Sequence, residues 1–372
     1  MSLVAFLDNS QSDAGAPATA DPRAARFHRS TPGYAPSAVA EAPAAAAALG
    51  LSRLVVKLET ERFGLPSFKV LGASWAACRA LSLRAGVEPT TFDELRRTCV
   101  RLDGLTLVAA TDGNHGRAVA HIARLLGLDA RILIPEHTAP ARIDAIAGEG
   151  ATVDIVRGSY DDAVARSAAL ASDDHLVISD TSWPGYEQVP GWVADGYATI
   201  FAELAEQVAG ELPALVAIQI GVGALASAAV RALAAPGRVI VGVEPGDAAC
   251  ALQAVRDGRP VLVPGPHRSI MAGLNCGLAS RVALPDMAAG IAAFCAIDDR
   301  AAERAVRLLL RDGLTCGETG ASGVAGLLAL RQDRPQRTWE PLGLDEAHPP
   351  ALVVCTEGPT DPQSFARIAA GA

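Results

Sequence analysis

The chain has 372 residues, half of them hydrophobic, and carries a net charge of -9 at pH 7. This length predicts about two domains, each with its own hydrophobic core. The acidic balance and the lack of a basic stripe exclude nucleic acid and anionic membrane surfaces as expected partners. No basic segment followed by an apolar block begins the chain, and no apolar run approaches the ~18 residues of a membrane helix, so we expect a cytoplasmic protein.

The seven cysteines are scattered, odd in number and contain no C-x-x-C pair. Because zinc sites and redox dithiols need closely spaced cysteines, we expect no metal and interpret most of these thiols as small buried hydrophobic residues. Cys276 lies in a glycine-bracketed loop that is a candidate border of a pocket. A disulfide between Cys250 and Cys276 is a hypothesis for this loop.

Residues 1–25 are rich in Ala, Ser, Asp and Pro, which predicts a mobile N-terminal arm. An Ala-rich helix is then expected over residues 38–49, ending at Gly50. Short β-branched runs alternate with helical segments along the remaining chain, which predicts an α/β protein with a mainly parallel sheet covered by helices on both faces. The predicted strands are residues 54–56, 106–109, 131–134, 153–156, 176–179, 215–220, 239–243 and 352–355.

We expect residues 73–194 to form a smaller inserted domain, because Lys69 and a glycine-rich loop near residue 221 flank this block. The large domain then comprises residues 26–72 and 195–372. In such folds ligands bind outside the carboxyl ends of the strands, so residues that follow predicted strands are the candidate site.

Lys69 lies between a predicted strand and a predicted helix and is flanked by Phe68 and Val70. An apolar surrounding lowers the pKa of a lysine, and the neutral amine can then attack an aldehyde to form a Schiff base. The alternative is a lysine whose stem packs against apolar side chains while its ammonium reaches water, and this segment alone favours that alternative.

A second motif, Thr-Asp-Gly-Asn-His-Gly, covers residues 111–116 and opens a predicted helix. A glycine-containing turn at a helix start directs backbone N–H groups outward and suits a carboxylate. Asn114 adds an amide that can donate to a phenolate-type oxygen. The alternative is an Asx turn that caps the helix, with His115 as a packing or capping residue.

A third motif, Gly-Val-Gly-Ala-Leu at residues 221–225, joins a predicted strand to a helix of small residues. Its backbone can cradle a single phosphate. Because it lacks a third glycine and a Gly-Lys-Ser/Thr ending, NAD and ATP fit it poorly. Asp180, Glu318 and Thr356 also follow predicted strands or helices, where an acidic side chain either caps a helix or faces a site.

In combination these motifs provide an amine for an aldehyde, an amide for a phenolate and a loop for a phosphate, which are the parts that hold pyridoxal phosphate. The order of these motifs along the chain, and the residues in them, resemble those of the tryptophan synthase β-like, fold-type II pyridoxal phosphate enzymes. Segments 27–34, 62–72, 271–277 and 356–362 are more specifically similar to the diaminopropionate ammonia-lyase family. Ala224 stands where that phosphate loop commonly has Ser, and Thr319 stands within the usual Glu-Ser-Gly.

The resemblance implies a homodimer of subunits with two lobes, each lobe containing a mainly parallel twisted sheet. It also implies α,β-elimination of 2,3-diaminopropionate to pyruvate and two ammonia. Lys69 would hold the cofactor, and Asp112 or Asp180 would take the α-proton, according to substrate chirality. A carboxylate at position 112, where related dehydratases have a small neutral residue, suits a substrate ammonium.

The other implied site residues divide into two groups. Those for the substrate are Thr111, Asp112, Gly113, His115 and Asp180. Those for the cofactor are Lys69, Asn114, Gly221, Val222, Gly223, Ala224, Leu225, Glu318 and Thr356. The alternatives are a serine or threonine dehydratase, a β-replacement enzyme, and a pyridoxal phosphate-binding protein without turnover.

Overall fold

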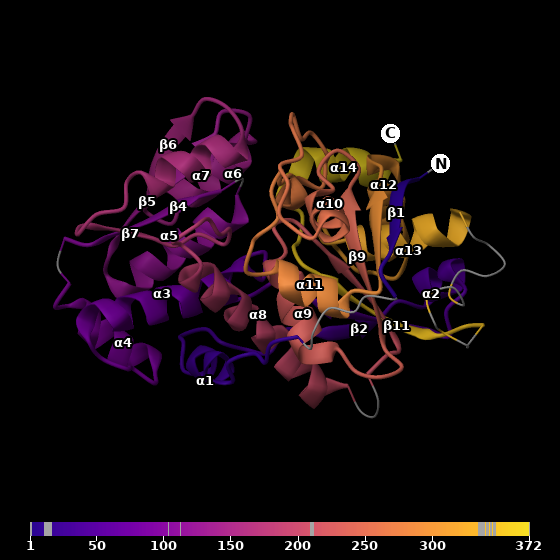
Figure 1. Cartoon of the computed structure of the whole chain (residues 1–372), viewed down its shortest axis with the longest axis horizontal. Coiled ribbons are helices and arrows are strands. Elements are labelled where there is room, and N and C mark those ends of the chain that lie inside the picture. The colour runs from indigo at the N-terminus through magenta and orange to yellow at the C-terminus, as the bar shows by residue number, and fades with distance from the viewer. Residues whose placement is uncertain are drawn as a thin grey trace.

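The computed structural model describes residues 2–10, 17–102, 104–111, 113–208, 212–333, 339, 342, 344 and 347–371. Its strands form two sheets, which lie at opposite sides of the view in Figure 1. The strands are β1 (Leu3–Asp8), β2 (Val39–Glu41), β3 (Arg53–Leu58), β4 (Thr106–Ala110), β5 (Asp129–Pro135), β6 (Thr152–Val156), β7 (His175–Val177), β8 (Leu215–Gln219), β9 (Val239–Pro245), β10 (Ala293–Ile297) and β11 (Pro350–Cys355).

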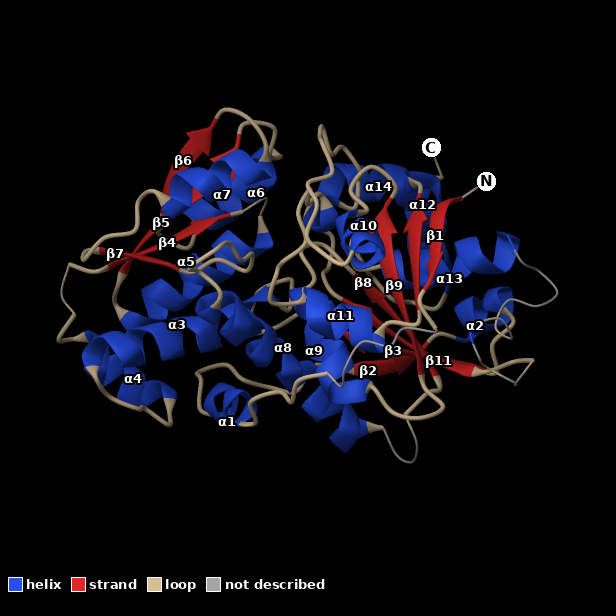
Figure 2. Ribbon diagram, viewed as in Figure 1, coloured by secondary structure: helices blue, strands red, loops and turns tan. Residues whose placement is uncertain are grey.

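Helices cover both sheets, as Figure 2 shows. The helices that precede β8 are α1 (Arg23–Arg29), α2 (Pro43–Leu49), α3 (Lys69–Ala85), α4 (Phe92–Cys99), α5 (Asn114–Leu126), α6 (Pro140–Ala147), α7 (Tyr160–Ala168) and α8 (Gln188–Gln207). The later ones are α9 (Ala224–Leu233), α10 (Cys250–Asp257), η1 (Ala272–Leu274), α11 (Leu284–Gly290), α12 (Asp299–Arg311), α13 (Ser322–Asp333) and α14 (Pro362–Ala370). The predicted α/β class is therefore confirmed.

The larger sheet has the order β1-β10-β9-β8-β11-β3-β2. Its five inner strands are parallel, and β1 and β2 pair antiparallel at the two edges. Successive side chains of a strand point to opposite faces. Accordingly, Val216 and Ile218 join the hydrophobic cluster that contains α9, whereas Leu215 and Ala217 join the cluster that contains α12 and α13. This double burial explains why the inner strands are almost continuously apolar.

The smaller sheet is all parallel, with the order β6-β5-β4-β7. It is built from the middle of the chain, where we expected an inserted domain. The boundaries of that domain at residues 73 and 194 stay a prediction. Among the described residues, no helix has both the length and the apolarity to cross a membrane.

Two local expectations near the N-terminus are wrong. The predicted mobile arm contains β1, which pairs with β10 almost 300 residues later in the chain. The helix expected from residue 38 begins only at Pro43, because Val39–Glu41 pairs with the edge of β3 instead. In both cases hydrogen bonds to a distant strand decide the local structure, and composition does not reveal them.

The disulfide hypothesis is also wrong. Cys250 and Cys276 are buried and no disulfide joins them, whereas Cys316 and Cys355 are bonded to each other. The bond joins the end of β11 to the loop before α13. The bond thereby holds the end of β11 and the loop before α13 together.

Helix α3 is held in place by an unusually close crossing with α8. A Cβ atom added to Gly72 would lie 2.4 Å from Cε1 of Tyr197, and one added to Gly196 would lie 2.5 Å from the backbone oxygen of Leu71. Only glycine permits this approach, because a Cβ would overlap the facing helix. Since α3 begins at Lys69, the crossing also fixes the position of that lysine.

We predict that Gly196→Ala lowers the free energy of unfolding by about 1–3 kcal/mol, because the added methyl meets rigid backbone. Gly191→Ala is the matched control on the same helix. A Cβ there would lie 3.7 Å from Val282, an ordinary contact. The control should be neutral or stabilising by up to about 1 kcal/mol, since alanine favours helix more than glycine does. Urea unfolding followed by circular dichroism measures both, and equal effects would contradict the prediction.

Candidate active site

A cavity between the two sheets collects residues that follow the carboxyl ends of strands. We call it the central cavity. The contributing strands are β3, β8 and β11 of the larger sheet and β4 and β7 of the smaller sheet. Its wall is formed by Phe68, Lys69, Thr111, Asn114, His115, Tyr160, Asp180, Tyr197, Gln219, Gly221, Val222, Gly223, Ala224, Leu225, Gly273, Leu274, Cys276, Thr319, Thr356 and Glu357. The segments that follow these strands therefore lie together, as expected for a ligand site of this fold class.

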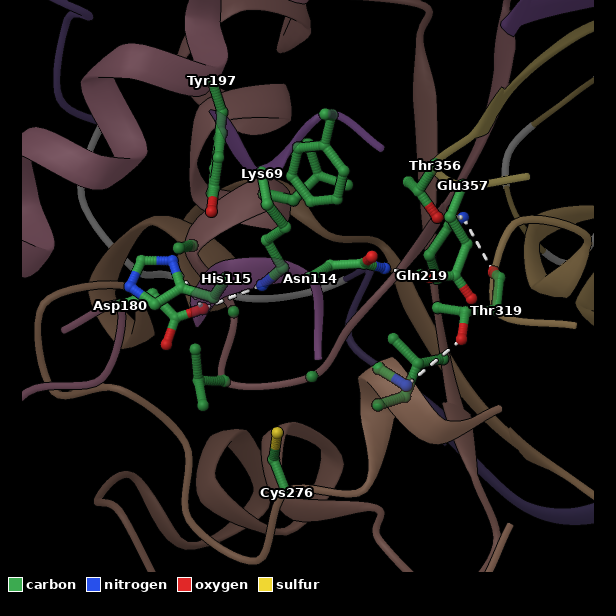
Figure 3. A pocket seen from close by; sticks show the side chains of 18 of the residues that line it. Lys69, Asn114, His115, Asp180, Tyr197, Gln219, Cys276, Thr319, Thr356 and Glu357 are labelled. Carbon is green, nitrogen blue, oxygen red and sulfur yellow. Dashed lines mark hydrogen bonds and ion pairs between the residues drawn. The ribbon is translucent and has the colours of Figure 1, made fainter. Parts of the chain in front are cut away.

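Lys69 is the first residue of α3, and its amine points across the central cavity (Figure 3). The Nζ atom lies 2.8 Å from Oδ2 of Asp180. The same atom lies 5.5 Å from the ring centre of Phe68 and 6.0 Å from that of Tyr197. The amine therefore has the apolar neighbours expected from the sequence, but a carboxylate also faces it directly.

The chain contains only one other lysine, Lys57. Its side chain is fully buried, and Nζ donates to a carboxylate oxygen of Glu203 at 2.7 Å and to the backbone oxygen of Ser37 at 2.8 Å. Lys57 does not line the central cavity. Lys69 is therefore the sole lysine whose amine can meet a ligand there.

Asp180 is a buried carboxylate that remains ionised. Burial alone would raise its pKa, but the positive charge of Lys69, the ring of His115 and hydrogen bonds from Lys69 and Tyr160 together hold the pKa well below its usual range. The Tyr160 hydroxyl donates to Oδ1 at 3.1 Å. His115 lies with Nδ1 3.9 Å from Oδ2, while its Nε2 meets the backbone oxygen of Ile178 at 2.8 Å. The carboxylate is thus fixed in one orientation.

Two helix starts border the central cavity and present backbone N–H groups. Asn114 begins α5, and its amide donates to the carboxylate of Glu357. Gly223 precedes α9 with a φ of +106°, and a Cβ there would lie 2.8 Å from Cε of Met287. The loop of residues 221–223, which we call the glycine cradle, brings its backbone to a helix start on the cavity wall, where N–H groups suit an anion.

Thr356 follows β11 and is almost fully buried, with its hydroxyl at the wall of the central cavity. Gln219, the last residue of β8, donates from Nε2 to this hydroxyl at 2.8 Å. Figure 3 shows both residues on the far side of Lys69 from Asp180.

Of the described residues proposed from the sequence, Gly113 and Glu318 do not line this cavity. Glu318 lines a neighbouring cavity of about 640 Å³, and Thr319 faces the central one in its stead. The reason is the turn before α13, which points adjacent side chains to different sides. Asp112 lies outside the described residues.

The wall also contains residues that the sequence did not lead us to propose, among them Gln219, Glu357, Tyr160 and Tyr197. Gln219 and Glu357 had a usable signal, because they adjoin the glycine loop and Thr356 respectively. Tyr160 and Tyr197 had none, since they come from α7 and α8 and reach the cavity only through tertiary packing.

Comparisons with known proteins identify the family of the chain. Residues 30–339 match the family model described as pyridoxal-phosphate dependent enzyme. The chain is 33% identical to diaminopropionate ammonia-lyase of Escherichia coli (strain K12) over 361 residues, covering 93% of this chain and 90% of that relative. It is 34% identical to diaminopropionate ammonia-lyase of Salmonella typhimurium (strain LT2) over 368 residues, covering 92% and 90%.

A solved structure indicates the same family. The crystal structure of diaminopropionate ammonia lyase from Escherichia coli in complex with an aminoacrylate-PLP azomethine reaction intermediate superposes with a TM-score of 0.87 and 30% identity. The alignment covers 98% of this chain and 96% of that one. The chain therefore belongs to the pyridoxal-phosphate dependent enzymes and, within them, to the diaminopropionate ammonia-lyase family.

Proposed function

We propose that this protein is a pyridoxal phosphate-dependent ammonia-lyase that converts 2,3-diaminopropionate and water to pyruvate and two molecules of ammonia. One observation carries the proposal. The sole lysine amine on the central cavity lies 2.8 Å from a buried, ionised carboxylate, opposite an amide and a glycine cradle. The activity of the relatives supports the choice of substrate.

The residues present fit pyridoxal phosphate. Lys69 would hold the aldehyde carbon, and the N–H groups of residues 221–225 would hold the phosphate at the start of α9. The Asn114 amide would face the phenolate oxygen, and the Thr356 hydroxyl would face the pyridine nitrogen. When bound, the cofactor supplies a conjugated ring that takes up the electron pair left at the substrate Cα.

The acidic residues would handle the substrate proton and ammonium groups. Oδ2 of Asp180 would accept the proton from Cα for one substrate enantiomer, and the carboxylate of Asp112 would do so for the other. The backbone N–H of His115, at the start of α5, would bind the substrate carboxylate. The N–H of Thr111 donates to the backbone oxygen of Leu133, and the N–H of Gly113 donates to Oγ1 of Thr111. A second ammonium on the substrate favours a site with two carboxylates, whereas serine or threonine has no such group.

Lys69→Ala and Lys69→Arg should each abolish the visible absorption of the purified, cofactor-loaded enzyme, because neither side chain forms a Schiff base. Lys69→Arg is the sharper variant, since it keeps a positive charge beside Asp180. Absorption spectra at equal protein concentration measure the effect. Wild-type protein that stays colourless with excess pyridoxal phosphate would contradict the cofactor assignment.

Asp112→Asn and Asp180→Asn should each reduce kcat by on the order of 10²-fold or more for the enantiomer whose Cα proton that residue accepts, as expected for positioned acid–base groups. Pyruvate release from D- and L-diaminopropionate, serine and threonine measures both activity and substrate class. Asp154→Asn is the control, because Asp154 pairs with Arg131 at the surface of the smaller sheet. Higher kcat/KM for serine than for either diaminopropionate would favour the dehydratase alternative.

We further propose that the enzyme is a homodimer, which the resemblance to fold-type II enzymes supports, and that it acts in the cytoplasm. Multi-angle light scattering of the purified protein should give twice the 38.2 kDa mass of the chain. A mass of one chain at micromolar concentration would rule out the stable dimer.

A further inference from the structure

The side-chain amide of Gln219 sits in a pocket of hydrogen-bond acceptors. Its Nε2 atom lies 3.0 Å from the backbone oxygen of Val354, 3.1 Å from that of Thr319 and 3.4 Å from that of Gly320. Carbonyl oxygens only accept hydrogen bonds, so the nitrogen of the amide and not its oxygen must occupy this position. Gln219 is 2% exposed, and the oxygen of the same amide has no hydrogen-bond partner among the described residues.

This fixed donor determines the direction of the neighbouring hydroxyl. The shortest contact of Nε2 is to Oγ1 of Thr356, at 2.8 Å. An amide nitrogen does not accept a hydrogen bond, so Oγ1 accepts and its own proton points elsewhere. Among the described residues no acceptor is recorded for that proton, and the hydroxyl lines the central cavity.

We propose that Gln219 is a positioning residue that turns the Thr356 hydroxyl proton into the central cavity, so that it donates to the pyridine nitrogen of the bound cofactor. This inference rests on the proposed function, which places that nitrogen at Thr356. It goes beyond that function by assigning the direction of the bond to a residue that does not touch the ring.

The direction has a chemical consequence. A hydroxyl that donates leaves the pyridine nitrogen without a full positive charge, because an alcohol does not give up its proton near neutral pH. A hydroxyl free to rotate could accept instead, and would then stabilise a protonated ring nitrogen. Gln219 therefore selects the less electron-withdrawing form of the ring.

Two substitutions test whether Gln219 fixes the direction of the Thr356 hydroxyl. Gln219→Met removes the amide and frees the Thr356 hydroxyl to rotate. Gln219→Glu keeps the size and places a carboxyl oxygen where Nε2 was, so that the hydroxyl can donate to it instead of to the cofactor. Gln253→Met is the matched control, because Gln253 bonds to Asp257 on α10 and does not line the central cavity.

The readout is the ¹⁵N resonance of enzyme loaded with ring-¹⁵N-labelled pyridoxal phosphate, without substrate. In wild type we expect the resonance of a neutral, hydrogen-bonded pyridine nitrogen. In both Gln219 variants it should move away from that value, and cofactor dissociation constants should rise about 3- to 10-fold, as for one lost hydrogen bond. The control should match wild type in both measurements.

A double-mutant cycle with Thr356→Val tests whether Gln219 acts through the hydroxyl. In the Thr356→Val background, Gln219→Met should cause no further change in resonance. An equal change with and without the hydroxyl would overturn the inference, as would a wild-type resonance that Thr356→Val leaves unmoved. Failure of wild type to bind pyridoxal phosphate would overturn the proposed function as well, so the two failures are distinguishable.

Discussion

The ion pair between Lys69 and Asp180 is the contact on which the site depends. It joins the first residue of α3 to the segment after β7, so it spans the space between the larger and the smaller sheet. Its 2.8 Å distance requires α3 to lie in one position, and the glycine crossing with α8 provides that. The carboxylate in turn is fixed by Tyr160, which leaves the amine as the movable partner that a ligand can take over.

The two lysines of the chain differ in role because their surroundings differ. Lys57 is enclosed by Glu203 and neighbouring acceptors, and Arg62 joins the same buried network through both Glu59 and Glu203. Burial lowers the pKa of Lys57, but each of its donors is occupied by a fixed partner. Removing one partner from such a network costs several kcal/mol. The segment from β3 to Lys69 is thus anchored at Arg62, while Lys69 faces a cavity.

Much of the fold and part of the site could be predicted from sequence because their signals are local. Apolar runs predict four of the five inner strands of the larger sheet, and the glycine motifs mark where helices begin after them. The prediction omits the fifth inner strand, β10, although it is apolar as well. The other failures have distant causes. Strand β1 forms because it pairs with β10, and Tyr197 reaches the cavity because α8 crosses α3. Glu318 was misplaced because a motif fixes a turn but not the side to which each side chain points.

The central claim is that Lys69 is the amine that holds pyridoxal phosphate. Borohydride reduction of the loaded enzyme, followed by proteolysis and mass spectrometry, tests it most directly, because reduction makes the cofactor attachment permanent. With only two lysines in the chain, the peptide map has few possible answers. The account predicts the reduced pyridoxyl group on Lys69 and none on Lys57. A modified Lys57, or no modified lysine, would contradict it.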